Sequence, residues 1–190
     1  MWRRGTYLDA MLPTDVLTAD ELQRLWMPGK RLELIKGVLV VREPAGYRHG
    51  EVTAELAYRL TQHVKAQNLG RVLAAETGFK LTSDPDTVRA PDVAFISEDR
   101  LPKTAPAGYA ELAPDLVVEV LSPDDRPGVV LAKVADWLTA GSRLVWVVDP
   151  LRWQVRVYRA DGSESLLDSE GTLEGEDVVP GFTCPVREIV

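Results

Sequence analysis

The sequence predicts an α/β fold in which a mixed central β-sheet is flanked by helices, with additional strands toward the N-terminal and C-terminal ends. Apolar runs at 115–121 and 144–148 are bounded by turn-forming residues, as is typical of strands covered on both faces. Apolar residues recur at every fourth position from Val52 to Val64, which predicts an amphipathic helix over 49–67. Because strands and helices are interspersed, we expect one main core.

The N-terminal part begins with a capping box, in which the Thr18 hydroxyl and the Glu21 carboxylate can satisfy backbone amides at the start of a helix. This short helix should end near 27–29. Two strands, 31–36 and 38–42, are expected on either side of a glycine turn. The long amphipathic helix follows after a break rich in proline and glycine.

The centre of the chain is rich in β-forming residues. Strands are expected at 71–75, 78–82 and 92–96, with a turn at 83–86 and a proline-containing loop at 98–114. These segments should add strands to the sheet beside the apolar run at 115–121.

The C-terminal part begins with a predicted helix. Polar residues at 122–125 are expected to cap it, and it should run to about Ala140. A buried strand at 144–148 should pair with a strand at 153–159. Short strands and turns are expected from there to the end.

Composition excludes some classes of protein. No stretch approaches the roughly 18–20 apolar residues that a membrane helix needs, and no apolar run follows the N-terminal arginines, so we expect neither a membrane span nor a secretory signal. Cys184 is the only cysteine, which excludes an internal disulfide and favours a reducing, cytoplasmic setting. We interpret it as a small apolar core residue.

The net charge has an uneven distribution. It is −7 overall, which is unusual for a protein that binds nucleic acid. The segment from Asp161 to Asp177 holds seven acidic residues and no basic one, so the rest of the chain has 22 of each sign. We expect this acidic segment to be a solvated edge, and a local basic groove elsewhere is compatible with the composition.

Glu119 is the most informative position. Side chains alternate faces along a strand, so Glu119 shares a face with Val117 and Leu121 in a run that otherwise looks buried. A buried carboxylate is costly unless a cation or hydrogen-bond donors hold it. Either an ion pair or a strand end open to water would also explain it.

Asp92 could act together with Glu119. It follows Pro91 at the start of an apolar strand, and two carboxylates that converge at one end of a sheet suit a hard divalent cation. An aspartate in this position can equally cap a turn.

Lys133 borders the apolar stripe of its helix, between Val130 and Trp137. Its ammonium could reach the two carboxylates and orient an attacking water. Alternatively, its aliphatic stem could cover the core while the ammonium stays in water.

Several segments together carry a family resemblance. They are Leu32–Gly37, the helix from His49, Ala90–Val93, Leu116–Pro123, Lys133 in its helix, Leu144–Pro150 and Pro180–Phe182. In this order and spacing, the chain resembles the Uma2 family of endonucleases in the PD-(D/E)xK superfamily. The resemblance implies a single restriction-endonuclease-like domain over 1–190. Within it, we expect an N-terminal arm and helix (1–30), a catalytic core (31–160) and an acidic C-terminal β extension (161–190).

The resemblance also implies site residues. Asp92 would be the first acid and Glu119 the second, and Lys133 would replace the lysine that the superfamily pattern has two residues after the second acid, where this chain has Leu121. Glu33 matches an additional acid on an N-terminal element. His49 would contact phosphate or structure the first turn of its helix.

The implied reaction is metal-dependent hydrolysis of phosphodiester bonds, most simply in DNA. Oxygens of Asp92 and Glu119, together with the carbonyl of Val120, would bind Mg²⁺ or Mn²⁺. Two alternatives stay open: a catalytically inactive module that binds protein or nucleic acid, and a hydrolase of a small phosphate compound. We also expect a homodimer, in which an apolar N-terminal segment packs on the partner; this segment contains Tyr7, Leu8, Met11 and Leu12.

Overall fold

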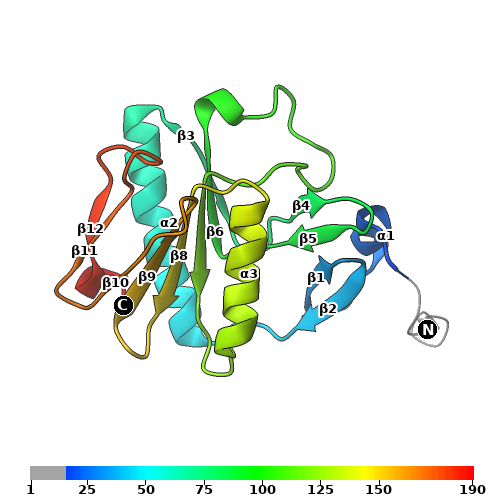
Figure 1. Cartoon of the computed structure of the whole chain (residues 1–190), viewed down its shortest axis with the longest axis horizontal. Helices are drawn as coiled ribbons and strands as arrows, with labels where there is room; N and C mark the ends of the chain where they lie inside the picture. Colours follow the sequence, from blue (N-terminus) through cyan, green and yellow to red (C-terminus); the bar gives the residue numbers. More distant parts are fainter. Residues whose placement is uncertain (1–15) are drawn as a thin grey trace, which may run out of the picture.

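The computed structural model describes residues 16–190, and its largest element is a six-stranded sheet between two helices (Figure 1). The expected α/β fold with a mixed sheet is confirmed. The N-terminal segment that we expect at a dimer interface lies outside the described residues. Among the described residues, no helix is both long and apolar enough to cross a membrane.

The large sheet has the strand order β10-β9-β8-β7-β6-β3. Its strands are β3 (Gly70–Ala74), β6 (Val93–Ser97), β7 (Leu116–Val120), β8 (Leu144–Asp149), β9 (Gln154–Arg159) and β10 (Glu164–Leu167). The central pair β7 and β8 is parallel, and the other neighbours are antiparallel. Helix α3 (Pro127–Thr139) makes the crossover between β7 and β8.

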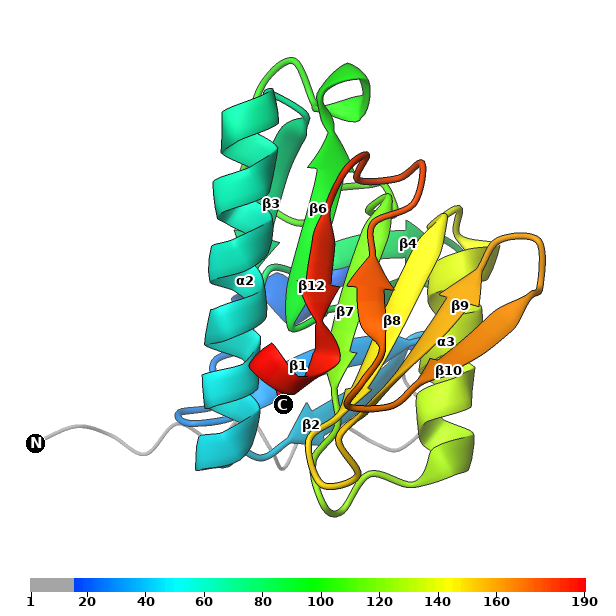
Figure 2. The same ribbon diagram turned by 90° about the vertical axis from the view of Figure 1, so that its left-hand side faces the viewer.

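Alternation along the central strands builds a core on each face of the large sheet. Val118 and Trp146 pack with helix α2 (Tyr47–Gln67), whereas Val117 and Val145 pack with Trp137 of α3. The two helices therefore cover opposite faces, as the turned view shows (Figure 2). A strand with apolar residues at nearly every position is stable here because both of its faces are covered.

A second sheet lies beside the N-terminal helix and has the order β2-β1-β5-β4. Its strands are β1 (Arg31–Ile35), β2 (Val38–Arg42), β4 (Phe79–Thr82) and β5 (Thr87–Arg89), and the helix is α1 (Ala19–Arg24). The capping box at Thr18 and Glu21 is present as predicted. Leu22 of α1 and Leu34 of β1 belong to one small core that holds this layer together.

The C-terminal segment covers the α2 side of the large sheet. Strands β11 (Thr172–Glu174) and β12 (Thr183–Pro185) form a ribbon that ends in a short 3-10 helix, η2 (Val186–Glu188). Another such helix, η1 (Glu98–Arg100), follows β6. Cys184 is fully buried in the core, as its sequence context predicts.

Two sequence predictions about local structure are wrong. Residues 122–125 do not cap the helix, which begins at Pro127 with Arg126 as its N-cap. Asp125 accepts a hydrogen bond from the Ser122 amide and closes a separate turn before the helix. Strand β5 was not predicted, because its three residues show no apolar alternation and two of them are polar. It is buried nevertheless, since it pairs with both β1 and β4.

Candidate active site

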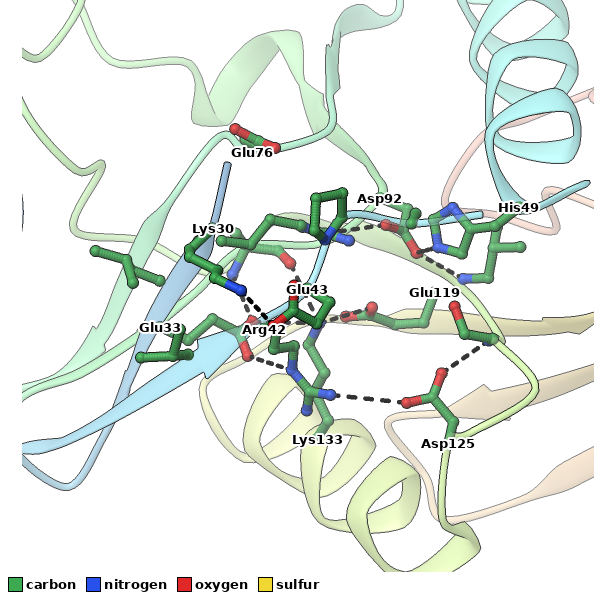
Figure 3. Close-up of a pocket in the computed structure, with 18 of the residues that line it drawn as sticks. Lys30, Glu33, Arg42, Glu43, His49, Glu76, Asp92, Glu119, Asp125 and Lys133 are labelled. Atoms are coloured by element: carbon green, nitrogen blue, oxygen red, sulfur yellow. Dashed lines mark hydrogen bonds and ion pairs between the residues drawn. The ribbon is translucent and has the colours of Figure 1, made fainter. Parts of the chain in front are cut away.

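Asp92, Glu119, Glu33 and Lys133 line one cavity of about 670 Å³ (Figure 3). Each comes from a different element: Glu33 from β1, Asp92 from the turn before β6, Glu119 from β7 and Lys133 from α3. The structure thus brings together the four side chains that the sequence and the resemblance single out. Three layers of the fold meet at this cavity.

Asp92 is held rigidly at the floor of the cavity. Its side chain is 3% exposed, and its amide donates to the Val118 carbonyl, which fixes the turn to the end of β7. One carboxylate oxygen accepts from Arg31 at 3.1 Å. The other accepts from the Val120 amide at 2.8 Å and lies 3.1 Å from Nε2 of His49. This carboxylate is therefore oriented by three donor groups.

Glu119 lies on the α3 face of β7, as strand alternation predicts. Its Oε2 is 2.8 Å from the Lys133 ammonium. Its Oε1 accepts a 2.8 Å hydrogen bond from the indole Nε1 of Trp137, a fully buried residue one turn after Lys133. Both carboxylate oxygens are thus held by the same helix.

Lys133 connects the carboxylates. Its Nζ also lies 3.2 Å from Oε1 of Glu33 and 3.2 Å from the Ala90 carbonyl. The ammonium therefore has oxygen partners from three elements and points into the cavity rather than to solvent. The ammonium reaches Glu119, as one of the two sequence interpretations expects, but its second carboxylate partner is Glu33 and not Asp92.

Burial and charge shift the protonation of Glu119. Removal of the carboxylate from water, together with the negative charges of Asp92 and Glu33, raises the pKa of Glu119 to about 7 despite the nearby Lys133. Protons and cations therefore compete for this carboxylate near neutral pH.

The pKa values of Lys133, Asp92 and Glu33 shift in the direction that keeps these groups charged. For Lys133, burial acts to lower the pKa, but the carboxylates of Glu119 and Glu33 outweigh it and the pKa is raised. For Asp92, burial acts to raise the pKa, but the hydrogen bonds from His49 and the Val120 amide outweigh it and the pKa is lowered. The pKa of Glu33 is also lowered, because Lys133 and Arg89 outweigh its burial.

Four residues of the site were not found from the sequence. Arg31 binds Asp92, Trp137 binds Glu119, and Arg89 and Arg42 contact Glu33 at 3.2 Å and 3.5 Å. Arg89 is only 2% exposed, and its position in β5 was missed together with that strand. Of these, only Trp137 could have been identified from the sequence, because it lies four residues after Lys133 on the same face of the helix.

The lining of the cavity carries an excess of acid, with seven acidic and four basic side chains. The acids are Glu33, Glu43, Glu76, Asp92, Glu119, Asp124 and Asp125, and the bases are Lys30, Arg31, Arg42 and Lys133. Such a cavity attracts cations and repels an isolated phosphate.

A protein-family model described as "Putative restriction endonuclease", that of the Uma2 family, matches residues 19–187. The chain belongs to this family. Among solved structures, the chain matches a "putative nuclease belonging to DUF820 from Anabaena variabilis" with a TM-score of 0.78 and 22% identity. The match covers 91% of this chain and 97% of that one, and it confirms the restriction-endonuclease-like fold. No curated protein matches the chain.

Restriction-endonuclease-like nucleases generally use divalent metal ions, and the donor set of this Uma2 site fits such an ion. Among residues 16–190, no group of three or more His, Cys, Asp or Glu side chains is arranged to hold a metal. Mg²⁺, however, is usually bound through one or two carboxylates and keeps several waters. Asp92 and Glu119 supply two carboxylates, and burial together with the charges of Asp92 and Glu33 raises the pKa of Glu119 despite Lys133, so a further cation beside it would be favourable.

Proposed function

We propose that this protein is a Mg²⁺- or Mn²⁺-dependent endonuclease that hydrolyses phosphodiester bonds in DNA. The observation that carries the proposal is the contact of Lys133 with Glu119 inside a buried acid cluster that also contains Asp92. The ammonium lies between the buried carboxylates of Glu119 and Glu33. This is the arrangement expected where a phosphate and a water must be bound together.

Asp92 and Glu119 are the proposed cation ligands, with the Val120 carbonyl beside them. When bound, the cation would polarise a phosphate oxygen and lower the pKa of a water. Hydrogen bonds from His49 and the Val120 amide outweigh burial and lower the pKa of Asp92, and Arg31 holds its other oxygen in place. Trp137 and Lys133 hold the two oxygens of Glu119 in place.

Lys133 is the proposed group that orients the attacking water and stabilises charge that develops on the phosphate. Its ammonium stays protonated because two carboxylates raise its pKa, so it acts as a hydrogen-bond donor rather than as a base. Glu33 lies 3.2 Å from the same ammonium and positions it. His49 is proposed to act by holding Asp92, since its Nε2 lies 3.1 Å from a carboxylate oxygen of Asp92, rather than by contacting phosphate directly.

The test is a plasmid-nicking assay titrated with Mg²⁺ or Mn²⁺, run beside calorimetric measurement of metal binding. Glu119→Gln should lose both metal affinity and nicking. Lys133→Met should lose turnover even at saturating metal, because the ammonium would stabilise charge that develops in the chemical step. Some loss of metal affinity is also expected, since Lys133 is one of the two side chains that fix Glu119. Asp115→Asn is a matched control, since Asp115 is a 1% exposed acid paired with Arg100 outside the cavity.

Two results would contradict the proposal. One is a wild-type protein that binds no divalent ion in calorimetry. The other is a folded Glu119→Gln protein that nicks plasmid as fast as the wild type. In either case, an inactive binding module becomes the better interpretation of this fold.

A further inference from the structure

Exposed aromatic side chains gather next to the candidate active site. In the described part of the chain, the strongly exposed aromatic residues are Trp26, Tyr47, Tyr58 and Trp153. Tyr47 is 87% exposed and stands between Gly46 and His49, which both line the cavity. Trp26 is 83% exposed and lies between the lining residues Leu25 and Lys30. Tyr58 lies away from the cavity, farther along α2.

Trp153 is brought to this region by the sheet. Strands β7 and β8 are parallel, with Glu119 paired to Val147, so the turn that follows β8 lies at the same sheet edge as the end of β7. Trp153 is in this turn with a left-handed backbone, φ 56°, and its side chain is 47% exposed. The guanidinium of Arg48 lies 5.9 Å from the centre of its ring.

This arrangement suits nucleotide bases. Single exposed aromatic residues are common on protein surfaces and need no explanation. Here, however, Tyr47 follows directly after the lining residue Gly46 beside a proposed phosphodiester site. Arg48, the next residue, pairs with Glu51 and lies over the ring of Trp153. Aromatic side chains next to a cation are the usual means by which proteins hold unpaired bases, because every base offers a flat face for stacking.

Burial of the acids also favours an unpaired strand as the substrate. Asp92, Glu119 and Glu33 are at most 7% exposed, so a scissile phosphate must enter the cavity to approach them. A continuous duplex is stiff and keeps its bases stacked on one another. A single strand can bend into a cavity and leave its bases free to stack on protein side chains.

We propose that Tyr47, Arg48 and Trp153 form a stacking surface for unpaired bases, and that the preferred substrate is single-stranded or locally unpaired DNA. The proposal rests on the proposed nuclease function and adds the substrate class. Tyr47 and Trp153 would each hold a base beside the scissile phosphate, and Arg48 would contact the ring and the backbone between them.

The test compares one oligonucleotide sequence in single-stranded, bubble and duplex form. Binding is measured by fluorescence anisotropy without divalent ions and again with Mg²⁺, and cleavage is measured separately on the same substrates. The variants are Tyr47→Ala and Trp153→Ala. Tyr58→Ala is the matched control, because it removes an exposed ring from the same helix as Tyr47 outside the cavity.

We expect the wild type to bind and cleave the single strand and the bubble in preference to the duplex. Each of the two alanine variants should weaken single-strand binding by about ten-fold, within the range for loss of one stacked base. Tyr58→Ala should leave binding unchanged. All three side chains are exposed, so the variants should fold as the wild type does.

The outcomes separate this proposal from the nuclease proposal. If both variants bind the single strand like the wild type, or lose duplex and single-strand affinity equally, the stacking surface is refuted while cleavage can still establish the nuclease. If the variants lose single-strand binding as expected but no substrate is cleaved with either metal, the nuclease function fails and the surface stands. A wild type that binds no oligonucleotide overturns the stacking surface as well.

Discussion

Replacing Trp137 by phenylalanine should weaken divalent-ion binding without dismantling the site. Trp137 is fully buried and packs edge-on against Phe79 at 6.1 Å between ring centroids. Phenylalanine keeps an aromatic ring in this position but cannot donate the hydrogen bond to Oε1 of Glu119. The Glu119 carboxylate then loses one of the two side chains that fix it, and the pKa of Glu119, already raised to about 7, should rise further.

The magnitude follows from the lost bond. A hydrogen bond to a charged group contributes about 1.5–3 kcal/mol. Loss of a partner that orients a metal ligand typically costs about 10–100-fold in metal affinity or activity. We therefore expect Mg²⁺ or Mn²⁺ to bind Trp137→Phe about 10–100-fold more weakly than the wild type at neutral pH, with a parallel loss of nicking at low metal concentration.

Trp146 provides the control. It is also fully buried and stacks on Phe182 at 5.7 Å, but on the opposite face of the sheet. Within residues 16–190, its indole nitrogen has no hydrogen-bond partner, so Trp146→Phe removes ring volume and no hydrogen bond. Trp137→Phe should lower the free energy of unfolding more than Trp146→Phe, measured by urea denaturation, because only Trp137→Phe also loses a hydrogen bond. Only Trp137→Phe should alter metal affinity measured by calorimetry.

The comparison has a clear refuting result. If Trp137→Phe binds metal as tightly as the wild type, the indole does not position Glu119 for a cation. If both variants lose metal affinity equally, the effect comes from general loosening of the core, and Trp137 is a packing residue.

Three further predictions follow from the site and the fold. Metal affinity should rise with pH up to about 7, by at most about ten-fold per unit, because Glu119 must release its proton to bind a cation; a flat calorimetric profile between pH 5 and 7 would contradict the raised pKa. Because folding raises the pKa of Glu119, its protonated form stabilises the fold below the unfolded pKa of about 4.3, and this stabilisation is lost as pH rises through about 7. A Glu119→Gln protein should lack this part of the pH dependence of unfolding. Thr18→Ala should lower the free energy of unfolding by about 0.5–2 kcal/mol through loss of the helix cap, and should leave metal binding unchanged; an unaltered urea midpoint would contradict this.

The sequence predicted the parts of the site that lie on regular, strongly patterned elements. Glu119 was identifiable because one charged residue interrupts an otherwise apolar strand, and alternation placed it on the correct face. Lys133 was identifiable because it borders the apolar stripe of a helix that must cover that face. For both residues, the local pattern gives the face on which the side chain lies, but it leaves alternatives open, and the resemblance supplies the expected role of Lys133.

The missed residues depend on contacts between distant segments. Arg31 and Asp92 are 61 positions apart, and Arg89 and Glu33 are 56 apart. Neither arginine stands out locally, since an arginine in a short strand is usually exposed to solvent. Their roles arise only when β1, β5 and the turn before β6 come together, and that pairing is set by tertiary packing.

The acidic balance of the chain is compatible with nuclease function once the cavity is considered. Its lining carries more acid than base, so a phosphate that approaches the site alone meets repulsion from Asp92, Glu119 and Glu33. A divalent cation reverses the sign of this interaction at the place where the phosphate must bind. The net charge of −7 is therefore compatible with the proposed nucleic-acid substrate. Under the proposed function, the acidic lining would make DNA binding in this cavity depend on the cation.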